Sequence, residues 1–141
     1  WVAGFLYSQL QVCPSQRIEP VILSEKDRSE RFKEIFMQWV TQTRADAVIL
    51  TTSDNGEEYD WAEELGLSVS QAFGIAVLSH RSYIPRIAGV SQRPQMVGAT
   101  AMDVLASMVL YNITSDKSTY QEVSLDGEWI DAPSVRPAPS V

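Results

Sequence analysis

The residue types of a serine hydrolase triad occur in this 141-residue chain as Ser79, His80 and Asp54. A triad needs a histidine that reaches the serine hydroxyl and a carboxylate that orients the histidine ring. Ser79 and His80 are adjacent, which makes it hard for one to activate the other. A nucleophile elbow is also missing, since the segment G-V-S-Q-R at 89–93 lacks the closing glycine. We therefore interpret His80 as a solvent-facing loop histidine and expect no enzyme activity, with a small α/β hydrolase as an alternative.

The sequence contains no clear motif for binding a nucleotide, a metal or a cofactor. Neither the G-x-G-x-x-G dinucleotide motif nor the Walker phosphate loop occurs. The chain has one cysteine, Cys13, and one histidine, which excludes multi-cysteine and two-histidine metal sites. We expect neither a metal nor a cofactor. The acidic run at 57–64 is a candidate cation site, but a solvated helix face with acid near the N-terminal dipole explains it better.

Alternating strands and helices must position these side chains. Short apolar runs of β-type residues predict strands at 20–23, 47–51, 74–78 and 86–90. Apolar residues at helical spacing predict helices over 1–11, 27–40, 54–65 and 94–112. Asp27 and Asp54, each with a glutamate three residues later, are the expected helix starts. This alternation predicts an α/β fold, a Rossmann-like parallel sheet with helices on both faces.

Polar residues follow each predicted strand. Sheets of this kind bind ligands at the carboxyl ends of their strands. A ligand cleft at that edge would be lined by hydrogen-bond donors and acceptors without any catalytic role. The side chains that we expect there are Ser24, Thr52, Ser53, Ser79, His80 and Gln92.

Composition bounds the possible partners. Hydrophobic residues make up 45% and charged residues 21%, values typical of a globular domain. No apolar run approaches the roughly 20 residues that a membrane helix needs, so we expect no membrane partner. The formal net charge of -7 makes direct nucleic-acid contact a poor hypothesis. Near the end of the chain, Asp126-Gly127 predicts a hairpin turn, and the proline-rich stretch at 133–141 is expected to be a tail.

Several short segments occur in a characteristic order along nearly the whole chain. They are V-A-G-F at 2–5, A-D-A-V-I at 45–49, G-L-S-V at 66–69, G-I-A-V at 74–77, G-V-S-Q-R-P at 89–94 with G-A-T-A at 98–101, D-G-E-W-I at 126–130 and S-V-R-P at 134–137. The series resembles the C-terminal part of LacI/GalR-family transcriptional regulators, with its L-A-G-F, P-D-A-V/I, G-L-x-V-P and T-V-x-Q-P…G-R-x-A segments. The family's Asn-Asp pair aligns with Thr52-Ser53 or, with a one-residue gap, with Ser53-Asp54, and its Asp-Asp pair aligns with Ser79-His80. A different effector than a sugar, or none, therefore stays open.

The resemblance implies a partial type I periplasmic-binding-protein-like fold. Residues 1–132 would form the effector-binding and dimerisation lobe, 91–113 a crossover helix shared with a first lobe, and 133–141 the tail. It implies a bacterial, cytoplasmic repressor that binds a small-molecule effector, with a sugar as one candidate. The regulator would be a homodimer and would contact DNA only through an upstream helix-turn-helix head. An exported solute-binding protein of the same fold is the alternative.

The resemblance also implies that parts of the fold lie outside this chain. The chain opens on Trp1 without an initiator Met or a signal peptide, and we interpret it as a piece of a longer protein. The predicted helix at 94–112 would then expose an apolar stripe, and the sheet would have an open edge. We expect both to be hidden by pairing with another copy. The residues of the stripe are Val97, Ala101, Val104, Leu105 and Met108.

Overall fold

The structure is a computed structural model that describes residues 1–113 and 122–137. The chain combines helices with a mostly parallel sheet, so the protein is α/β, as the sequence predicts. The helices are α1 (Val2–Gln9), the 3-10 turn η1 (Pro14–Gln16), α2 (Glu25–Glu30), α3 (Phe32–Thr43), α4 (Glu58–Glu64) and α5 (Pro94–Leu110). The strands are β1 (Ala47–Leu50), β2 (Gly74–Val77), β3 (Ala88–Ser91) and β4 (Glu128–Ile130).

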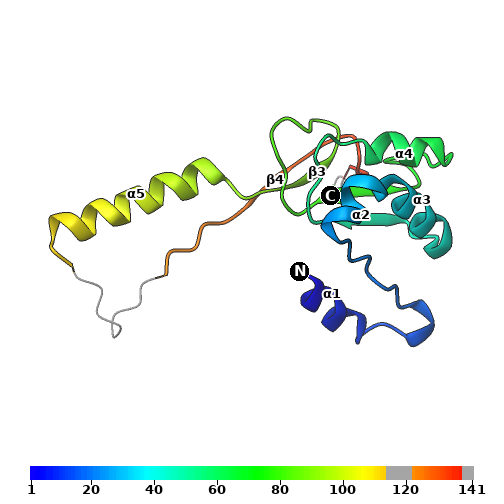
Figure 1. Ribbon diagram of the computed structural model, residues 1–141, viewed down its shortest axis with the longest axis horizontal. Coiled ribbons are helices and arrows are strands. Elements are labelled where there is room, and N and C mark those ends of the chain that lie inside the picture. The colour runs from blue at the N-terminus through cyan, green and yellow to red at the C-terminus, as the bar shows by residue number, and fades with distance from the viewer. Residues whose placement is uncertain (114–121, 138–141) are drawn as a thin grey trace.

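The strands form one open sheet in the order β1-β2-β3-β4 (Figure 1). β1, β2 and β3 are parallel, with Val48 opposite Ile75 in the first pair. β4 runs antiparallel to β3 and places Trp129 opposite Val90. The sheet is therefore mixed rather than wholly parallel. Because β1, β2 and β3 point the same way, the loops that follow them leave from one edge of the sheet.

One face of the sheet carries the packed core. The predicted helical stripes turn their apolar side chains onto this face, and Phe32, Phe36 and Trp61 meet edge to face with ring centroids 5.3 to 6.3 Å apart. Edge-to-face contacts of this kind add to the stabilisation from apolar burial. The buried apolar side chains of the core come from α3, α4, the strands and the loops after them: Phe36, Val40, Val48, Ala62, Val69, Phe73, Ile75, Val77, Ile84 and Ile87.

The expectation of helices on both faces is wrong for the described residues. α3 and α4 share the core face, whereas no residue of α1 or α5 is buried. Ile49 points to the opposite face of β1 and is 68% exposed. Only one crossover between the parallel strands carries a helix: α4 connects β1 to β2, and no helix lies between β2 and β3. A right-handed crossover fixes the side of α4, and α3, which precedes β1, packs beside it. In Figure 1, α5 extends away from the sheet and α1 lies apart from it.

The predicted strand at 20–23 is not formed. These residues are coil, and Ile22 is 74% exposed. The segment is held at its start, where the indole Nε1 of Trp39 donates to the Glu19 carbonyl oxygen at 3.1 Å. An apolar run becomes a buried strand only if both of its faces are covered. Here the face of the sheet opposite the core is bare, so the run has no apolar layer to enter.

The predicted hairpin at Asp126-Gly127 is also replaced by a longer-range pairing. The residues that follow the turn form β4, but β4 pairs with β3 rather than with the segment before the turn. Part of that segment, residues 120 and 121, lies outside the described residues. β3 offers an otherwise unpaired edge, and pairing there joins β4 to a sheet that already has a core.

The start of the predicted tail packs against the sheet through Ser134. Ser134 is fully buried. Its hydroxyl donates to the Ile75 carbonyl oxygen at 2.6 Å and accepts from the Ala88 amide at 2.8 Å, and so it bridges β2 and β3. Residues 133–137 therefore belong to the folded body, and 138–141 lie outside the described residues.

Candidate functional site

Five of the six predicted cleft residues fall into two groups at the carboxyl edge of the sheet. Thr52 and Ser53 follow β1 and line a small polar cavity of about 250 Å³. Ser79, His80 and Gln92 follow β2 and β3 and do not line that cavity. The sixth, Ser24, lies at the start of α2. The structure therefore brings Thr52 and Ser53 together and leaves the second group apart from them.

A buried hydrogen-bonded pair holds the loop after β1. The Ser53 hydroxyl and the Glu58 carboxyl oxygen Oε2 are 2.6 Å apart, and the two residues are 1% and 2% exposed. The Gly56 amide donates to the same Ser53 oxygen at 3.0 Å. Gly56 has a φ of 75°, a backbone conformation that favours glycine, and this lets the loop turn back toward α4. Ser53 therefore links the loop to the first turn of α4.

Burial raises the pKa of the Glu58 carboxyl above its usual value of 4.5. The hydrogen bond from Ser53 opposes this shift, because it stabilises the charged form. The nearby carboxylates of Glu57 and Asp54 raise the pKa further. The acidic run at 57–64 is therefore not a uniformly solvated helix face, since Glu58 is turned into the protein.

The hydroxyl oxygen of Thr52 is buried and has no hydrogen-bond partner among the described residues. An unsatisfied buried hydroxyl of this kind costs about 1 to 3 kcal/mol. Aromatic rings and charged side chains form the walls of the cavity beside it. The lining residues are Arg28, Glu30, Phe32, Lys33, Thr52, Ser53, Asp54, Asn55, Glu57, Glu58 and Trp61.

Arg28 connects α2 to the loop after β1. Its guanidinium lies 3.3 Å from the Asp54 carboxylate. Asp54 is therefore an ion-pair partner and not the helix cap that the sequence predicts; α4 begins after Glu57 with no side-chain cap. α2 likewise begins at Ser24 and not at Asp27, because the Ser24 hydroxyl accepts from the Asp27 amide at 3.1 Å. Ser24 supports the site by capping the helix that carries Arg28.

The second group of predicted residues is held by backbone groups. The His80 amide donates to the Val90 carbonyl oxygen, and His80 Nε2 lies 3.2 Å from the Ile84 carbonyl oxygen. His80 is half-buried rather than solvent-facing. Its ring therefore meets a backbone carbonyl and, among the described residues, no serine hydroxyl. Gln92 is exposed, and its side-chain amide approaches the Leu78 carbonyl oxygen at 3.5 Å.

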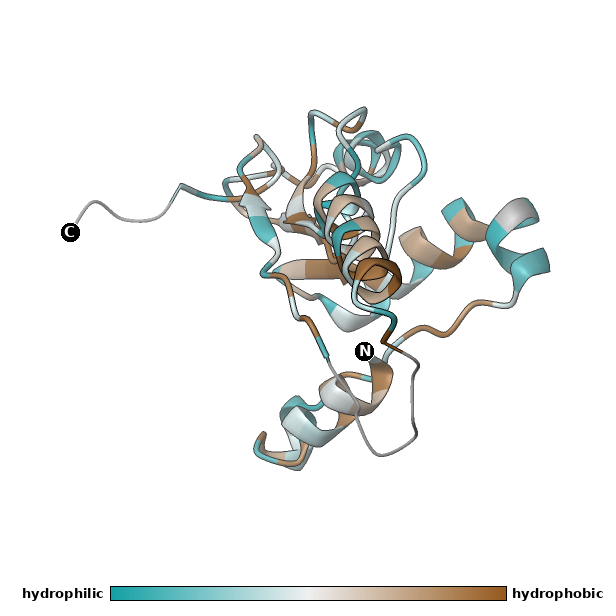
Figure 2. Cartoon of the chain, turned by 90° about the vertical axis from the view of Figure 1, so that its left-hand side faces the viewer, coloured by the Kyte–Doolittle hydropathy of each residue, from teal (hydrophilic) through white to brown (hydrophobic). Residues whose placement is uncertain are grey.

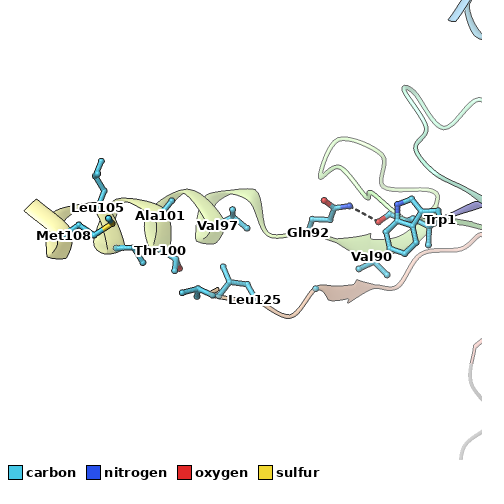
Figure 3. Close-up of a pocket in the computed structure, with 13 residues that line it drawn as sticks. Trp1, Val90, Gln92, Val97, Thr100, Ala101, Leu105, Met108 and Leu125 are labelled. Carbon is cyan, nitrogen blue, oxygen red and sulfur yellow. Dashed lines mark hydrogen bonds between the residues drawn. The ribbon is translucent and has the colours of Figure 1, made fainter. Parts of the chain in front are cut away.

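A larger, apolar groove runs between α5 and the segment before β4 (Figure 3). Its volume is about 890 Å³, within the range of ordinary ligand pockets. No charged side chain of the described residues lines it. The lining residues are Trp1, Leu78, Val90, Gln92, Val97, Thr100, Ala101, Val104, Leu105, Met108, Val123, Leu125 and Gly127.

Only Thr52 and Ser53 of the eleven residues that line the small cavity belong to the sequence-based set, and the missing ones include Arg28 and Glu58, which hold the loop after β1. Arg28 lies on a short helix, and nothing in its local spacing points to Asp54, which is 26 residues away. Glu58 belongs to an acidic run that is otherwise typical of a wet helix face. The hydrogen-bond partner of Glu58, Ser53, lies five residues earlier in the chain, and this spacing is not a known sequence motif. Both contacts depend on tertiary packing.

Comparisons with known proteins add no information about the site. No family model, no curated protein and no solved structure matches this chain. Among the described helices, none is long and apolar enough to cross a membrane. In the described ranges, no cluster of three or more histidine, cysteine, aspartate or glutamate side chains is arranged to hold a metal ion.

Proposed function

We propose that this chain is the ligand-sensing and dimerisation part of a LacI/GalR-type transcriptional regulator. The ordered series of segments in the sequence supports the family, and the parallel strands β1 to β3 with polar residues at their carboxyl ends are compatible with its type I periplasmic-binding-protein-like lobe. The regulator works in the cytoplasm as a homodimer, and DNA contact belongs to a head outside these 141 residues. The net charge of -7 agrees with DNA contact by a separate head, because a DNA-binding surface is usually basic.

The observation that carries ligand sensing is the unpartnered Thr52 hydroxyl beside the small polar cavity. A bound ligand offers this hydroxyl the hydrogen bond that residues 1–113 and 122–137 do not. The cavity is slightly smaller than the usual range for drug-sized ligands, which favours a small polar effector. Because the oxygen is buried, the ligand reaches it through a small shift of the loop after β1.

Such a shift has a route to the rest of the chain. The loop is joined to α4 by Ser53 and Glu58, and to α2 by Asp54 and Arg28. A ligand that binds one position of the loop more tightly changes the relative populations of the two positions. Both helices then move with the loop, and this movement is the proposed signal to the dimer.

Thermal unfolding with a panel of small polar compounds tests this proposal, with monosaccharides, nucleosides and alkylamines as separate groups. A ligand present at about 100 times its Kd adds about 2.7 kcal/mol of stability. For a chain of this size, that corresponds to a rise in Tm of about 5 to 10 °C. Thr52→Val should lose the rise, and Thr51→Val, which changes an exposed neighbour, should keep it.

A panel that leaves the Tm of the unmodified chain unchanged argues against ligand sensing. The family is tested separately by sequencing the gene upstream of the Trp1 codon. A helix-turn-helix motif followed by another α/β lobe supports the regulator. A signal peptide in its place identifies an exported solute-binding protein.

A further inference from the structure

The wall of the small cavity beside Thr52 carries an excess of negative charge. Four of its eleven side chains are carboxylic acids and two are bases, so its formal charge is -2 with all six ionised and -1 if Glu58 holds its proton. Part of the wall comes from α2, whose residues are all polar or charged and are coloured as hydrophilic in Figure 2. The acids are Glu30, Asp54, Glu57 and Glu58, and the bases are Arg28 and Lys33. This wall therefore attracts a cationic ligand and repels an anionic one.

Both bases of the cavity are already paired with carboxylates. The Arg28 guanidinium lies 3.3 Å from the Asp54 carboxylate. The Lys33 ammonium lies 2.7 Å from the Glu64 carboxylate. Glu57, in contrast, forms no ion pair with any residue that the structure describes. An anionic ligand would have to break an existing ion pair beside this carboxylate, whereas a cation finds the Glu57 charge available.

The buried Thr52 hydroxyl and two aromatic rings complete the recognition surface. The Thr52 oxygen can accept a hydrogen bond from an ammonium N–H, and charge-assisted bonds of this kind are about twice as strong as neutral ones. The half-buried rings of Phe32 and Trp61 line the same cavity and meet edge to face with centroids 5.3 Å apart. Aromatic rings attract cations and also cover alkyl groups. The cavity therefore offers one ligand an acceptor, a carboxylate and an apolar wall.

We propose that the ligand of this cavity is a small alkylammonium cation. The inference rests on the proposed function, because it names the ligand class of the same cavity. The ammonium group donates to the Thr52 hydroxyl and faces the Glu57 carboxylate, and the alkyl chain lies along Phe32 and Trp61. An ammonium group has several N–H donors, so it can serve both oxygen acceptors at once. A neutral ligand would satisfy Thr52 but leave the Glu57 charge without a partner.

Calorimetric titration of the chain with n-butylammonium chloride tests this ligand class. The first control is n-butanol, which has nearly the same shape and no charge. The second is n-butyltrimethylammonium, which keeps the charge and the chain but has no N–H donor. We expect both controls to bind at least about 10-fold more weakly than n-butylammonium, because neither can form the charge-assisted hydrogen bond to Thr52. Either control binding as tightly as n-butylammonium overturns the inference.

Variants of the cavity wall locate the bound cation. Glu57→Gln keeps the size of the side chain and removes its charge, and it should weaken n-butylammonium binding about 2- to 5-fold, as expected for an exposed ion pair. Glu63→Gln removes an exposed carboxylate of α4 that does not line the cavity, and it should bind like the parent. Thr52→Val should weaken binding at least about 10-fold. Equal affinities of Glu57→Gln and Glu63→Gln overturn the inference.

The panel of small polar compounds distinguishes failure of the cation from failure of ligand sensing. A rise in Tm with alkylamines alone, lost in Thr52→Val, supports both. A Thr52-dependent rise with monosaccharides or nucleosides, and none with alkylamines, overturns the cation and leaves ligand sensing in place. A Tm that no group of compounds changes argues against both.

Discussion

Ser134 satisfies both backbone polar groups of Ile75. The Ile75 amide donates to the Ser134 carbonyl oxygen at 2.9 Å, and the Ser134 hydroxyl donates to the Ile75 carbonyl oxygen at 2.6 Å. The same hydroxyl accepts from the Ala88 amide on β3. β2 and β3 pair directly at Ala76–Ala88 and Val77–Gly89, and Ser134 joins the two strands at the amino-terminal end of that pairing. A single side chain therefore completes a seam in the middle of the sheet.

Replacement of this hydroxyl should destabilise the chain markedly. Ser134→Ala leaves the Ile75 carbonyl and the Ala88 amide buried without partners. We expect the free energy of unfolding to fall by about 2 to 4 kcal/mol. Urea unfolding measures the loss. Ser82→Ala, on an exposed loop, is the matched control and should stay within about 0.5 kcal/mol of the parent. A loss at Ser134 no greater than that control would mean that water replaces the hydroxyl.

Glu58 should make stability fall as pH rises. Its folded-state pKa is raised above 4.5, so the folded state binds more protons than the unfolded state between 4.5 and the folded-state value. The free energy of unfolding contributed by this group is therefore largest below pH 4.5 and decreases through that window. The slope is at most about 1.4 kcal/mol per pH unit.

Glu58→Gln removes this titration. In urea unfolding from pH 4.5 upward, we expect the variant to gain stability relative to the parent as pH rises. Glu63→Gln, an exposed carboxylate of the same helix, should follow the parent. Parallel pH profiles of Glu58→Gln and the parent would show that Glu58 titrates normally.

Gly89 and Gly98 should respond in opposite directions to alanine. A Cβ at Gly89 would overlap the carbonyl oxygen and the side chain of Val77 on the neighbouring strand. Gly89→Ala should therefore cost about 1 to 3 kcal/mol. A Cβ at Gly98 meets no atom within 4 Å, and Gly98→Ala in the helix interior should add about 0.5 to 1 kcal/mol. Thermal unfolding distinguishes the two. A Gly89→Ala variant as stable as the parent would contradict the close approach of β2 to β3, and a destabilised Gly98→Ala would contradict the open space beside Gly98.

Removal of the Thr52 hydroxyl should stabilise the ligand-free chain. Thr52→Val keeps the shape of the side chain and replaces the unsatisfied hydroxyl with a methyl group. We expect the free energy of unfolding to rise by about 1 kcal/mol. Thr51→Val, at the exposed position before it, should change little. Destabilisation of Thr52→Val in urea would show that the hydroxyl is already paired, for example with water.

The elements with a strong internal pattern could be predicted from the sequence. α3 has apolar residues at helical spacing, and its Phe36 and Val40 are buried as that spacing requires. β1 and β2 are short apolar runs that the structure confirms. The run at 20–23 looks the same in sequence, but a strand forms only where neighbours cover it. The pairing of β4 could not be predicted either. A sequence that predicts a turn does not specify which strand the residues after the turn will pair with.

Part of the candidate site could be predicted in the same way. Thr52 and Ser53 were identified because residues after a parallel strand gather at one edge of the sheet. Glu58 and Ser134 are polar residues with under 3% of their surface exposed, whereas their residue types predict exposure to solvent. Their burial follows from partners that are five to 59 residues away in the chain.

Ser134 also determines when the sheet can be completed. The contacts that close β2 against β3 span 46 and 59 residues, and β4 joins β3 from the same late part of the chain. During synthesis, the central seam stays open until residue 134 has left the ribosome. Chains released before that point keep exposed amide and carbonyl groups at the centre of the sheet, where other nascent chains can pair with them. The residues around Ser134 thus separate a nascent chain that can fold from one that aggregates or is degraded.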